Sequence, residues 1–195
     1  MMKIETLTGS TVRLEPLMES HREPLRLAAQ DERIWEFNIA TGYGPAFDTW
    51  FEAAKKGSEA GTRMPFVVVR VADGTVIGST SYLDPMPVHW RVEVGHTWYS
   101  PTAWSTAVNP ECKKLLLGHA FECWGMNRVA FHVDAINLRS QRAVTKLGAI
   151  REGILRQHAV VHNGRIRDTV VFSIIRAEWP VVRERLTSRL AGPST

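Results

Sequence analysis

The spacing of apolar residues changes along the chain, and each change predicts a different secondary structure. Over residues 47–59 apolar positions recur every three or four residues, which is the period of a half-buried helix. The next two stretches, PFVVVRV and TVIGSTSYL, are strand-like, and Asp73-Gly74 between them is typical of a tight hairpin turn. Residues 90–98 then alternate as on a half-buried strand. Its largely apolar face is expected to carry Trp90, Val92, Val94, His96 and Trp98, with Glu93 on the other face.

The same patterns assign the rest of the chain. We expect strands over residues 11–16, 128–134, 150–162 and 165–175, with a second hairpin turn at Asn163-Gly164. Helices are expected over about 20–30, 109–124, 138–147 and 178–190, and Asp31 is expected to cap a further short one. Two prolines make DPMPVHW a predicted loop rather than part of a central strand.

This order of elements predicts an α/β fold. Seven strands would form one mixed sheet with helices on both faces, and the strands on either side of the 109–124 helix should be parallel because a helix connects them. Nothing in the sequence divides the chain, so residues 1–195 are expected to form a single domain.

Composition narrows the class of protein. The chain is 44% hydrophobic and 23% charged, which is ordinary for a globule with a sizeable core. No apolar run reaches membrane-spanning length and the N-terminus lacks an export signal, so we expect a cytoplasmic protein without membrane contact. The only two cysteines, Cys112 and Cys123, fall roughly 16 Å apart on one predicted helix and cannot pair, so we expect reduced and mostly buried thiols.

The net charge of +4 suits an anionic ligand. The best candidate for binding one is WSTAVN, residues 104–109, which leads into a predicted helix whose free N–H groups would point at an anion. Asn109 is expected to be the N-cap, Pro110 the first helical residue, and Lys113 a nearby charge. Such loops are usually rich in glycine, and here Ala107 and Asn109 would have to replace it. The loop therefore predicts either a pyrophosphate site or a helix cap alone.

Three segments carry a resemblance to a known family: WSTAVN, RVAFHVD (128–134) and NLRSQRAVTKLGAIREG (137–153). Together with the order of elements they resemble the GNAT superfamily of acetyltransferases, and the RimJ/RimL-type branch most closely. The matching motif positions are Asn137, Ser140, Lys146, Leu147, Gly148, Glu152 and Gly153. The chain departs from the family at Trp104, Ala107 and Asn109, where the pyrophosphate loop usually carries Gln or Arg, Gly, and Gly or Ala.

The resemblance implies an acetyl-CoA-dependent N-acetyltransferase in which a primary amine attacks the thioester directly. The acceptor would be a protein N-terminus or a small amine, such as an amino acid, a polyamine or an amino sugar. In this fold two central parallel strands splay apart around the cofactor, and Gly95 is consistent with a bulge at the splay. The residues expected to bind acetyl-CoA are His96, Thr97, Trp98, Trp104, Ser105, Thr106, Ala107, Val108, Asn109, Asn137 and Arg142.

The resemblance also suggests roles for side chains. Ser140 would protonate the departing sulfur, although Ser or Asn there could simply cap a helix. Glu93 is the candidate general base and acceptor contact, unless it forms an ion pair with Arg91 or another basic residue. His96 and His132 are expected to be packed or hydrogen-bonded. Trp35, Phe37 and Tyr43 are expected either in the acceptor pocket or in plain core or lid positions.

No metal site is expected, because His158 and His162 lie four apart on a strand rather than on a helix. A homodimer is plausible from the long terminal hairpin. Two other functions stay open: a non-catalytic acyl-CoA-binding protein of the same fold, and a nucleic-acid-binding domain that uses the arginines of the last helix. We expect no nucleic-acid partner, because the chain has no basic run flanked by aromatic residues.

Overall fold

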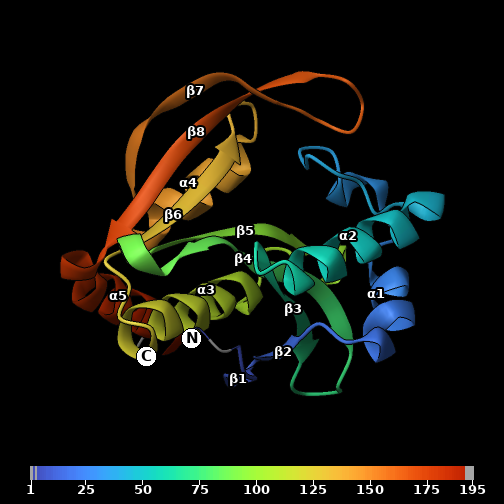
Figure 1. The fold of residues 1–195 in the computed structure, drawn as a ribbon. Coiled ribbons are helices and arrows are strands. Elements are labelled where there is room, and N and C mark those ends of the chain that lie inside the picture. Colours follow the sequence, from blue (N-terminus) through green and yellow to red (C-terminus); the bar gives the residue numbers. More distant parts are fainter. Residues whose placement is uncertain (1, 3, 192–195) are drawn as a thin grey trace.

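A computed structural model describes residues 2 and 4–191, and within them eight strands form one mixed sheet flanked by helices (Figure 1). The strands are β1 (Leu7–Thr8), β2 (Val12–Pro16), β3 (Arg63–Arg70), β4 (Val76–Met86), β5 (Arg91–Tyr99), β6 (Arg128–Asp134), β7 (Ile150–Val160) and β8 (Ile166–Ile175). The helices are α1 (Arg22–Ala28), α2 (Phe47–Glu59), α3 (Val108–Gly118), α4 (Leu138–Leu147) and α5 (Trp179–Ala191), and a π-helical turn over His119–Cys123 extends α3.

The sheet runs in the order β1-β2-β3-β4-β5-β6-β8-β7. The predicted mixed sheet is confirmed: β5 and β6 are parallel, and the β3–β4 and β7–β8 hairpins are antiparallel. β1 was not predicted; it adds a two-residue edge strand beside β2. β8 lies between β6 and β7, so the last hairpin extends the sheet beyond the parallel pair.

The prediction of a loop at DPMPVHW is wrong in its first half. β4 continues through Pro85 to Met86, which pairs with Arg91 of β5. The strand tolerates the proline because the pairing is irregular between Leu83 and Met86, so no ladder hydrogen bond is required from the residue that lacks an N–H.

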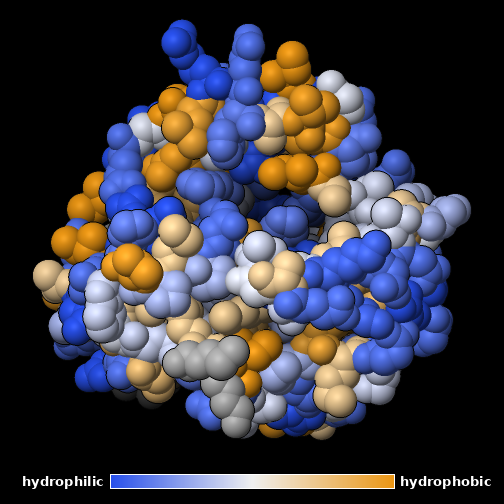
Figure 2. All heavy atoms as spheres, in the orientation of Figure 1, coloured by the Kyte–Doolittle hydropathy of each residue, from blue (hydrophilic) through white to orange (hydrophobic). Residues whose placement is uncertain are grey.

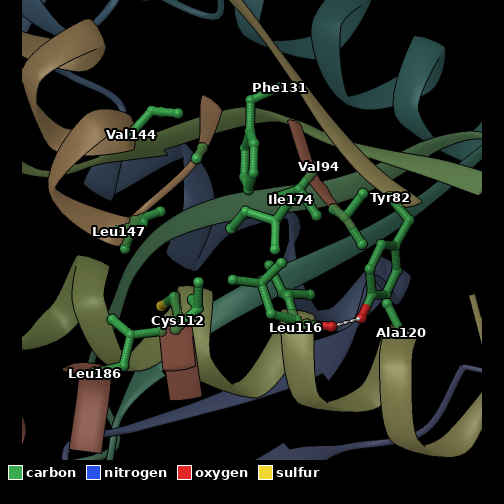
Figure 3. Close-up of a cluster of buried hydrophobic side chains, with 14 of the residues drawn as sticks. Tyr82, Val94, Cys112, Leu116, Ala120, Phe131, Val144, Leu147, Ile174 and Leu186 are labelled. Carbon is green, nitrogen blue, oxygen red and sulfur yellow. Dashed lines mark hydrogen bonds between the residues drawn. The ribbon is translucent and has the colours of Figure 1, made fainter. Parts of the chain in front are cut away.

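Two apolar clusters cover opposite faces of the sheet. One packs α3, α4 and α5 against the strands, and Figure 3 shows part of it, with Phe131 of β6 above Leu116 of α3 and Tyr82 donating a hydrogen bond to the Leu116 carbonyl, 2.6 Å. The second packs α1, α2 and the segment between them around Trp35, Trp50 and Trp98. The apolar spacing of residues 109–124 predicts a buried stripe of Leu116, Leu117, Ala120, Phe121 and Trp124. The first four are buried, but Trp124 is only partly buried.

Candidate active site

The parallel strands β5 and β6 separate after three residue pairs. Their ladder runs only from Arg91↔Arg128 to Glu93↔Ala130, whereas β6 continues to pair with β8 as far as Asp134↔Thr169. The expected splay between the central parallel strands is therefore present, and it opens toward their C-terminal ends. Figure 2 shows the molecule hollowed between the part that carries β6–β8 and the part that carries α2 and β3–β5.

A bulge in β5 lies at the start of this splay. Ser79 pairs with Trp98 and Ser81 with Gly95, so two residues of β5, His96 and Thr97, face one residue of β4. The expected bulge is confirmed, but the residue that adopts the left-handed conformation is His96, with φ +47°, and not Gly95.

The extra residue shifts the side-chain alternation by one position. The prediction that His96 and Trp98 share a face with Val94 is therefore wrong. Trp98 packs in the opposite cluster with Trp35 and Trp50, at ring-centroid distances of 5.2 and 5.6 Å.

The larger of two cavities lies at the splay and has a volume of about 670 Å³. Most of the residues expected to bind acetyl-CoA line it: Thr97, Trp98, Trp104, Ser105, Thr106, Asn109, Asn137 and Arg142, together with Ser140. The tertiary structure thus brings together segments that are separated by about forty residues of chain. Ala107 and Val108 belong to the same loop and helix start but do not line the cavity.

The loop before α3 differs in detail from the prediction. The helix begins at Val108, so Asn109 lies inside its first turn and is not the N-cap; its side-chain oxygen instead accepts a hydrogen bond from the Tyr99 hydroxyl, 3.2 Å. Pro110 is accordingly the third helical residue and not the first. The left-handed conformation falls on Ser105, φ +60°, rather than on Ala107 or Asn109.

The loop nevertheless keeps the features that an anion requires. The backbone N–H groups of Ser105, Thr106 and Ala107 donate no hydrogen bond within residues 2 and 4–191. The Thr106 hydroxyl accepts from the Val108 N–H at 3.3 Å and donates to the Ala103 carbonyl at 2.8 Å, which fixes the turn. Free donors at the start of a helix favour a phosphate group in front of them.

Sequence reasoning treated Lys113 only as a nearby charge, but the structure buries it. Its side chain is 6% exposed, donates to the Thr97 hydroxyl at 3.0 Å and lies 5.8 Å from the ring centre of Phe131. It therefore bridges the two diverging strands beneath the cavity. Burial lowers the pKa of the Lys113 ammonium to about 8. The pattern of polar residues in α3 did not predict that Lys113 would be buried. The burial arises because Lys113 lies on the helix face that meets the sheet.

Asn137 and Ser140 lie together at the start of α4. The Asn137 side-chain oxygen accepts a hydrogen bond from the Ser140 N–H, 2.9 Å, so Asn137 does cap this helix. The Ser140 hydroxyl has no hydrogen-bond partner among the described residues and lines the larger cavity. Arg139, which the sequence did not single out, lies over the ring of Trp104 at 4.7 Å and joins α4 to the loop before α3.

A smaller cavity of about 170 Å³ lies against the tryptophan cluster. Its apolar wall is formed by Trp35, Ile39, Ala40, Trp50 and Trp98, and its polar wall consists of Asn38, Glu93, His96, His132, His158 and Arg167. The two cavities share Asn38, Trp98, His132 and Arg167, so they meet at these side chains.

Glu93 and His132 form a pair in the smaller cavity. A Glu93 carboxylate oxygen lies 2.7 Å from His132 Nδ1, so the partner that the ion-pair alternative required is His132 and not Arg91. A carboxylate at Nδ1 favours the proton on that nitrogen and leaves Nε2 as the acceptor. Because His132 also borders the larger cavity, its ring lies between the two spaces.

The other histidines of the smaller cavity are placed by bulges. His96 opens into the cavity from the β5 bulge; desolvation by the surrounding protein, with Arg63 and Arg167 nearby, lowers its pKa to about 4 and keeps it neutral. His158 projects from an irregular stretch of β7, between Leu155 and Ala159, where Gln157 has φ +49°. Its ring lies 5.9 Å from that of His132.

The three aromatic residues suggested for the acceptor pocket have different positions. Trp35 is buried, donates its indole N–H to the Ala29 carbonyl at 3.0 Å and forms part of the smaller cavity's wall. Phe37 lines the larger cavity, and Tyr43 is exposed and lines neither.

In the described part of the chain, no group of three His, Cys, Asp or Glu side chains is placed to hold a metal ion, and no helix is both long and apolar enough to span a membrane. Its two cysteines are free; Cys112 is buried, while Cys123 is exposed, contrary to the expectation of a buried thiol.

Comparison with known proteins identifies the family. Residues 11–150 match the acetyltransferase (GNAT) domain, so the chain belongs to the GNAT acetyltransferase family. The uncharacterized N-acetyltransferase YoaA of Bacillus subtilis is 30% identical over 101 residues, 52% of this chain and 56% of YoaA. The chain thus spans about half the length of the curated relatives it matches.

Solved structures agree with the fold. A candidate acetyltransferase superposes with a TM-score of 0.90 at 36% identity, covering 100% of this chain and 98% of its own. Two more distant proteins share the fold alone. RimJ of Mycobacterium smegmatis, solved with CoA-disulfide, has a TM-score of 0.77 at 18% identity, covering 91% of this chain and 88% of RimJ. A spermidine N-acetyltransferase of Vibrio cholerae, solved with CoA and spermine, has a TM-score of 0.74 at 18% identity, covering 88% of this chain and 99% of the enzyme.

Proposed function

We propose that this GNAT protein is an acetyl-CoA-dependent N-acetyltransferase of the RimJ/RimL type, in which a primary amine attacks the thioester directly. One observation carries the proposal: the larger cavity, with free loop N–H groups at one end, meets the smaller cavity at a histidine paired with a carboxylate. RimJ and the spermidine enzyme were solved with CoA or its disulfide, which supports CoA for this fold.

The larger cavity is the proposed cofactor site. The N–H groups of Ser105, Thr106 and Ala107 and the positive end of α3 would hold the diphosphate, and Asn137 and Arg142 would contact the rest. The bound thioester supplies an activated acetyl group. Backbone N–H groups at the β5 bulge, near His96–Trp98, would orient its carbonyl oxygen.

The residues around the junction have complementary roles in the proposed transfer. His132 Nε2 accepts the proton of the attacking amine, and Glu93 holds the His132 ring and stabilises its charge. The new N–C bond replaces the C–S bond, and the Ser140 hydroxyl gives a proton to the sulfur. Glu93 thus acts through His132, which refines the expectation that it is the base itself.

The first test is calorimetric titration with acetyl-CoA, followed by a screen of amines and N-terminal peptides for release of CoA thiol. We expect binding and turnover with one acceptor class. Binding without thiol release from any acceptor would replace the proposal with a non-catalytic acyl-CoA-binding role. Absence of binding to a well-folded sample would contradict both.

Variants then test the roles. His132→Gln and Ser140→Ala should each lower kcat at least about tenfold while CoA affinity barely changes. Glu93→Gln should lower kcat, because His132 loses the carboxylate that holds its ring. A Ser140→Ala enzyme with unchanged kcat would remove Ser140 from the mechanism.

We also propose a cytoplasmic homodimer that uses the β7–β8 hairpin. Apolar side chains gather on this hairpin in Figure 2, and Ile154, Leu155, Val160 and Ile166 are each more than 40% exposed. Light scattering coupled to size exclusion should give twice the chain mass of 22.0 kDa, and Ile166→Glu should return the monomer. A monomeric wild-type protein at micromolar concentration would contradict this assembly.

A further inference from the structure

The smaller cavity contains a buried arginine without an ion-pair partner in the described part of the chain, although Glu93 and Asp134 attract its charge from beyond ion-pair distance. Arg167 of β8 is 6% exposed, and within the described residues it forms no ion pair. Its Nε donates to the Thr169 hydroxyl at 3.0 Å and one Nη donates to the His132 carbonyl at 3.2 Å. A guanidinium has five N–H donors, so three remain without an acceptor in the protein. Burial lowers the pKa of Arg167, but a guanidinium stays charged at neutral pH.

A second donor in the same wall has no partner either. The indole N–H of Trp98 is buried and unpaired within the described residues, although Trp98 is only 4% exposed. Buried donors are normally hydrogen-bonded, because leaving one unsatisfied costs on the order of 1–3 kcal/mol. This buried indole N–H, beside an arginine with N–H groups that have no acceptor among the described residues, indicates that an anionic or strongly polar ligand group completes the cavity.

The carboxylate and the guanidinium of this wall both contact His132. Glu93 contacts the ring of His132, and Arg167 contacts the backbone carbonyl of the same residue. Among the residues that line the cavity, Glu93 is the only carboxylate and Arg167 the only arginine. A polyamine would need several carboxylates, and it would be repelled by Arg167. The volume of about 170 Å³ also suits a compact acceptor better than a peptide segment.

From this arrangement we infer that the acceptor is a small amino acid-like molecule, whose amine faces His132 while its carboxylate is bound by Arg167 and the Trp98 indole N–H. The inference rests on the proposed transferase function and specifies its substrate class. The amine nitrogen forms the bond to the acetyl carbon and gives its proton to His132, while the sulfur leaves with a proton from Ser140. The product is an N-acetylamino acid.

The decisive experiment compares matched pairs of acceptors on the full chain with acetyl-CoA. Each pair is an α-amino acid and the amine that lacks its carboxylate, such as leucine with isoamylamine and phenylalanine with phenethylamine; spermidine and a tetrapeptide complete the set. We expect kcat/KM for at least one amino acid to exceed that of its partner by at least about tenfold, the value of one charged hydrogen bond. Equal or better turnover of the decarboxylated amines, spermidine or the peptide would overturn the inference.

A variant series separates Arg167 from the chemistry. Arg167→Gln should raise KM for the amino acid about tenfold or more and leave KM for the matched amine unchanged. Arg151→Gln is the control, since this exposed arginine makes the same charge change on β7 and lines neither cavity. An equal fall of kcat for both acceptors would place Arg167 at the thioester and overturn the inference.

Trp98→Phe provides a second, independent test that can be carried out even if Arg167→Gln does not fold. It keeps an aromatic ring but removes the indole N–H, and it should weaken amino acid binding in a calorimetric titration of the CoA-loaded protein. Unchanged amino acid affinity in both variants would contradict the assignment. Failure to release thiol with any acceptor would overturn the transferase function itself, whereas turnover of the decarboxylated amines alone would overturn only the amino acid class.

Discussion

At the scale of single residues, the site places charged groups where folding alone does not favour them. Lys113 is the clearest case, because its ammonium lies between the splayed strands with a hydroxyl as its hydrogen-bond partner and no carboxylate. A lysine in this position destabilises the free protein. The polar groups of a bound cofactor would supply hydrogen-bond acceptors for its ammonium. Function therefore explains the residue better than stability does.

Replacement of Lys113 by methionine should stabilise the free protein. The pKa of Lys113 is lowered from 10.5 to about 8, so the folded state disfavours the charged form by at most about 3 kcal/mol at neutral pH. Between pH 8 and 10.5 the unfolded chain binds more protons, so wild-type stability rises with pH in this window. Lys113→Met should raise the unfolding free energy at pH 7, lose that advantage near pH 10, and weaken CoA binding. Urea unfolding at both pH values would show a constant difference if the idea is wrong.

Glu111 has the opposite effect on stability. Its carboxylate accepts hydrogen bonds from the N–H groups of Ser10, Thr11 and Val12 and from the Ser10 hydroxyl, at 2.7–3.0 Å. Burial alone would raise the pKa of Glu111, but these bonds outweigh it and lower the pKa below 4.5. The stabilisation is therefore present above pH 4.5 and disappears as pH falls through the folded-state value.

Glu111→Gln should destabilise the protein by about 2–3 kcal/mol at pH 7, because an amide places N–H donors against backbone donors. The difference from wild type should shrink in acid, where the carboxyl of the wild type is also protonated. Glu184→Gln, on an exposed position of α5, is the control. A difference that does not depend on pH would contradict the role of ionised Glu111.

At the scale of elements, irregular pairing in two strands places two of the histidines of the smaller cavity. The β5 bulge turns His96 toward that cavity, and the irregular stretch of β7 does the same for His158. Regular alternation would have directed His96 to the other face of the sheet. Interruptions in strand pairing therefore decide which side chains of β5 and β7 face the site.

Gly78 shows how closely β4 and β5 approach beside the bulge. A Cβ at this position would lie 2.2 Å from the Trp98 carbonyl oxygen and 2.9 Å from the Tyr99 Cα, and backbone atoms cannot move aside cheaply. Gly78→Ala should cost about 1–3 kcal/mol of stability and weaken CoA binding by displacing β5. Gly153→Ala on β7, where nothing lies within 4 Å, should be close to neutral in the same thermal melts. Similar melting temperatures for the two variants would contradict this constraint.

At the scale of the whole molecule, the β5–β6 ladder is the shortest in the sheet apart from that of the two-residue edge strand β1. Three residue pairs join the β1–β5 part to the β6–β8 part, and the larger cavity occupies the space where further pairs would form. A ligand in that space would restore contacts between the two parts.

Hydrogen exchange should detect this bridging. Saturating CoA is expected to slow exchange in peptides that cover residues 94–99, 104–109 and 131–134, because the ligand shields amides that have no partner in the ladder. Peptides from the β2–β3 pair, whose ladder is complete from Val12↔Arg70 to Pro16↔Phe66, should not change. Uniform slowing over the whole chain, or none, would show that the cofactor does not fill the splay.

Local pattern was sufficient for most of the fold. Periodicity located α2, α3 and the strands β2–β8, and Asp73-Gly74 and Asn163-Gly164 located both hairpins, because these signals depend on neighbours in sequence. The same locality explains the errors: Asn109 was expected to be an N-cap from residue type alone, yet its side chain bonds to Tyr99 of another element. Asn137, by contrast, does cap α4, as its position just before that helix in the sequence suggested.

The sequence by itself determined the α/β class, the family, and the segments that form the larger cavity. Only the tertiary structure decided that Glu93 pairs with His132, that Lys113 is buried between the strands, and that Arg167 lines the smaller cavity without an ion pair among the described residues. These facts depend on contacts between strands that are remote in sequence and on one extra residue in β5. Apolar periodicity records which face of an element is buried, but it carries no information about which polar group on a distant strand will meet it.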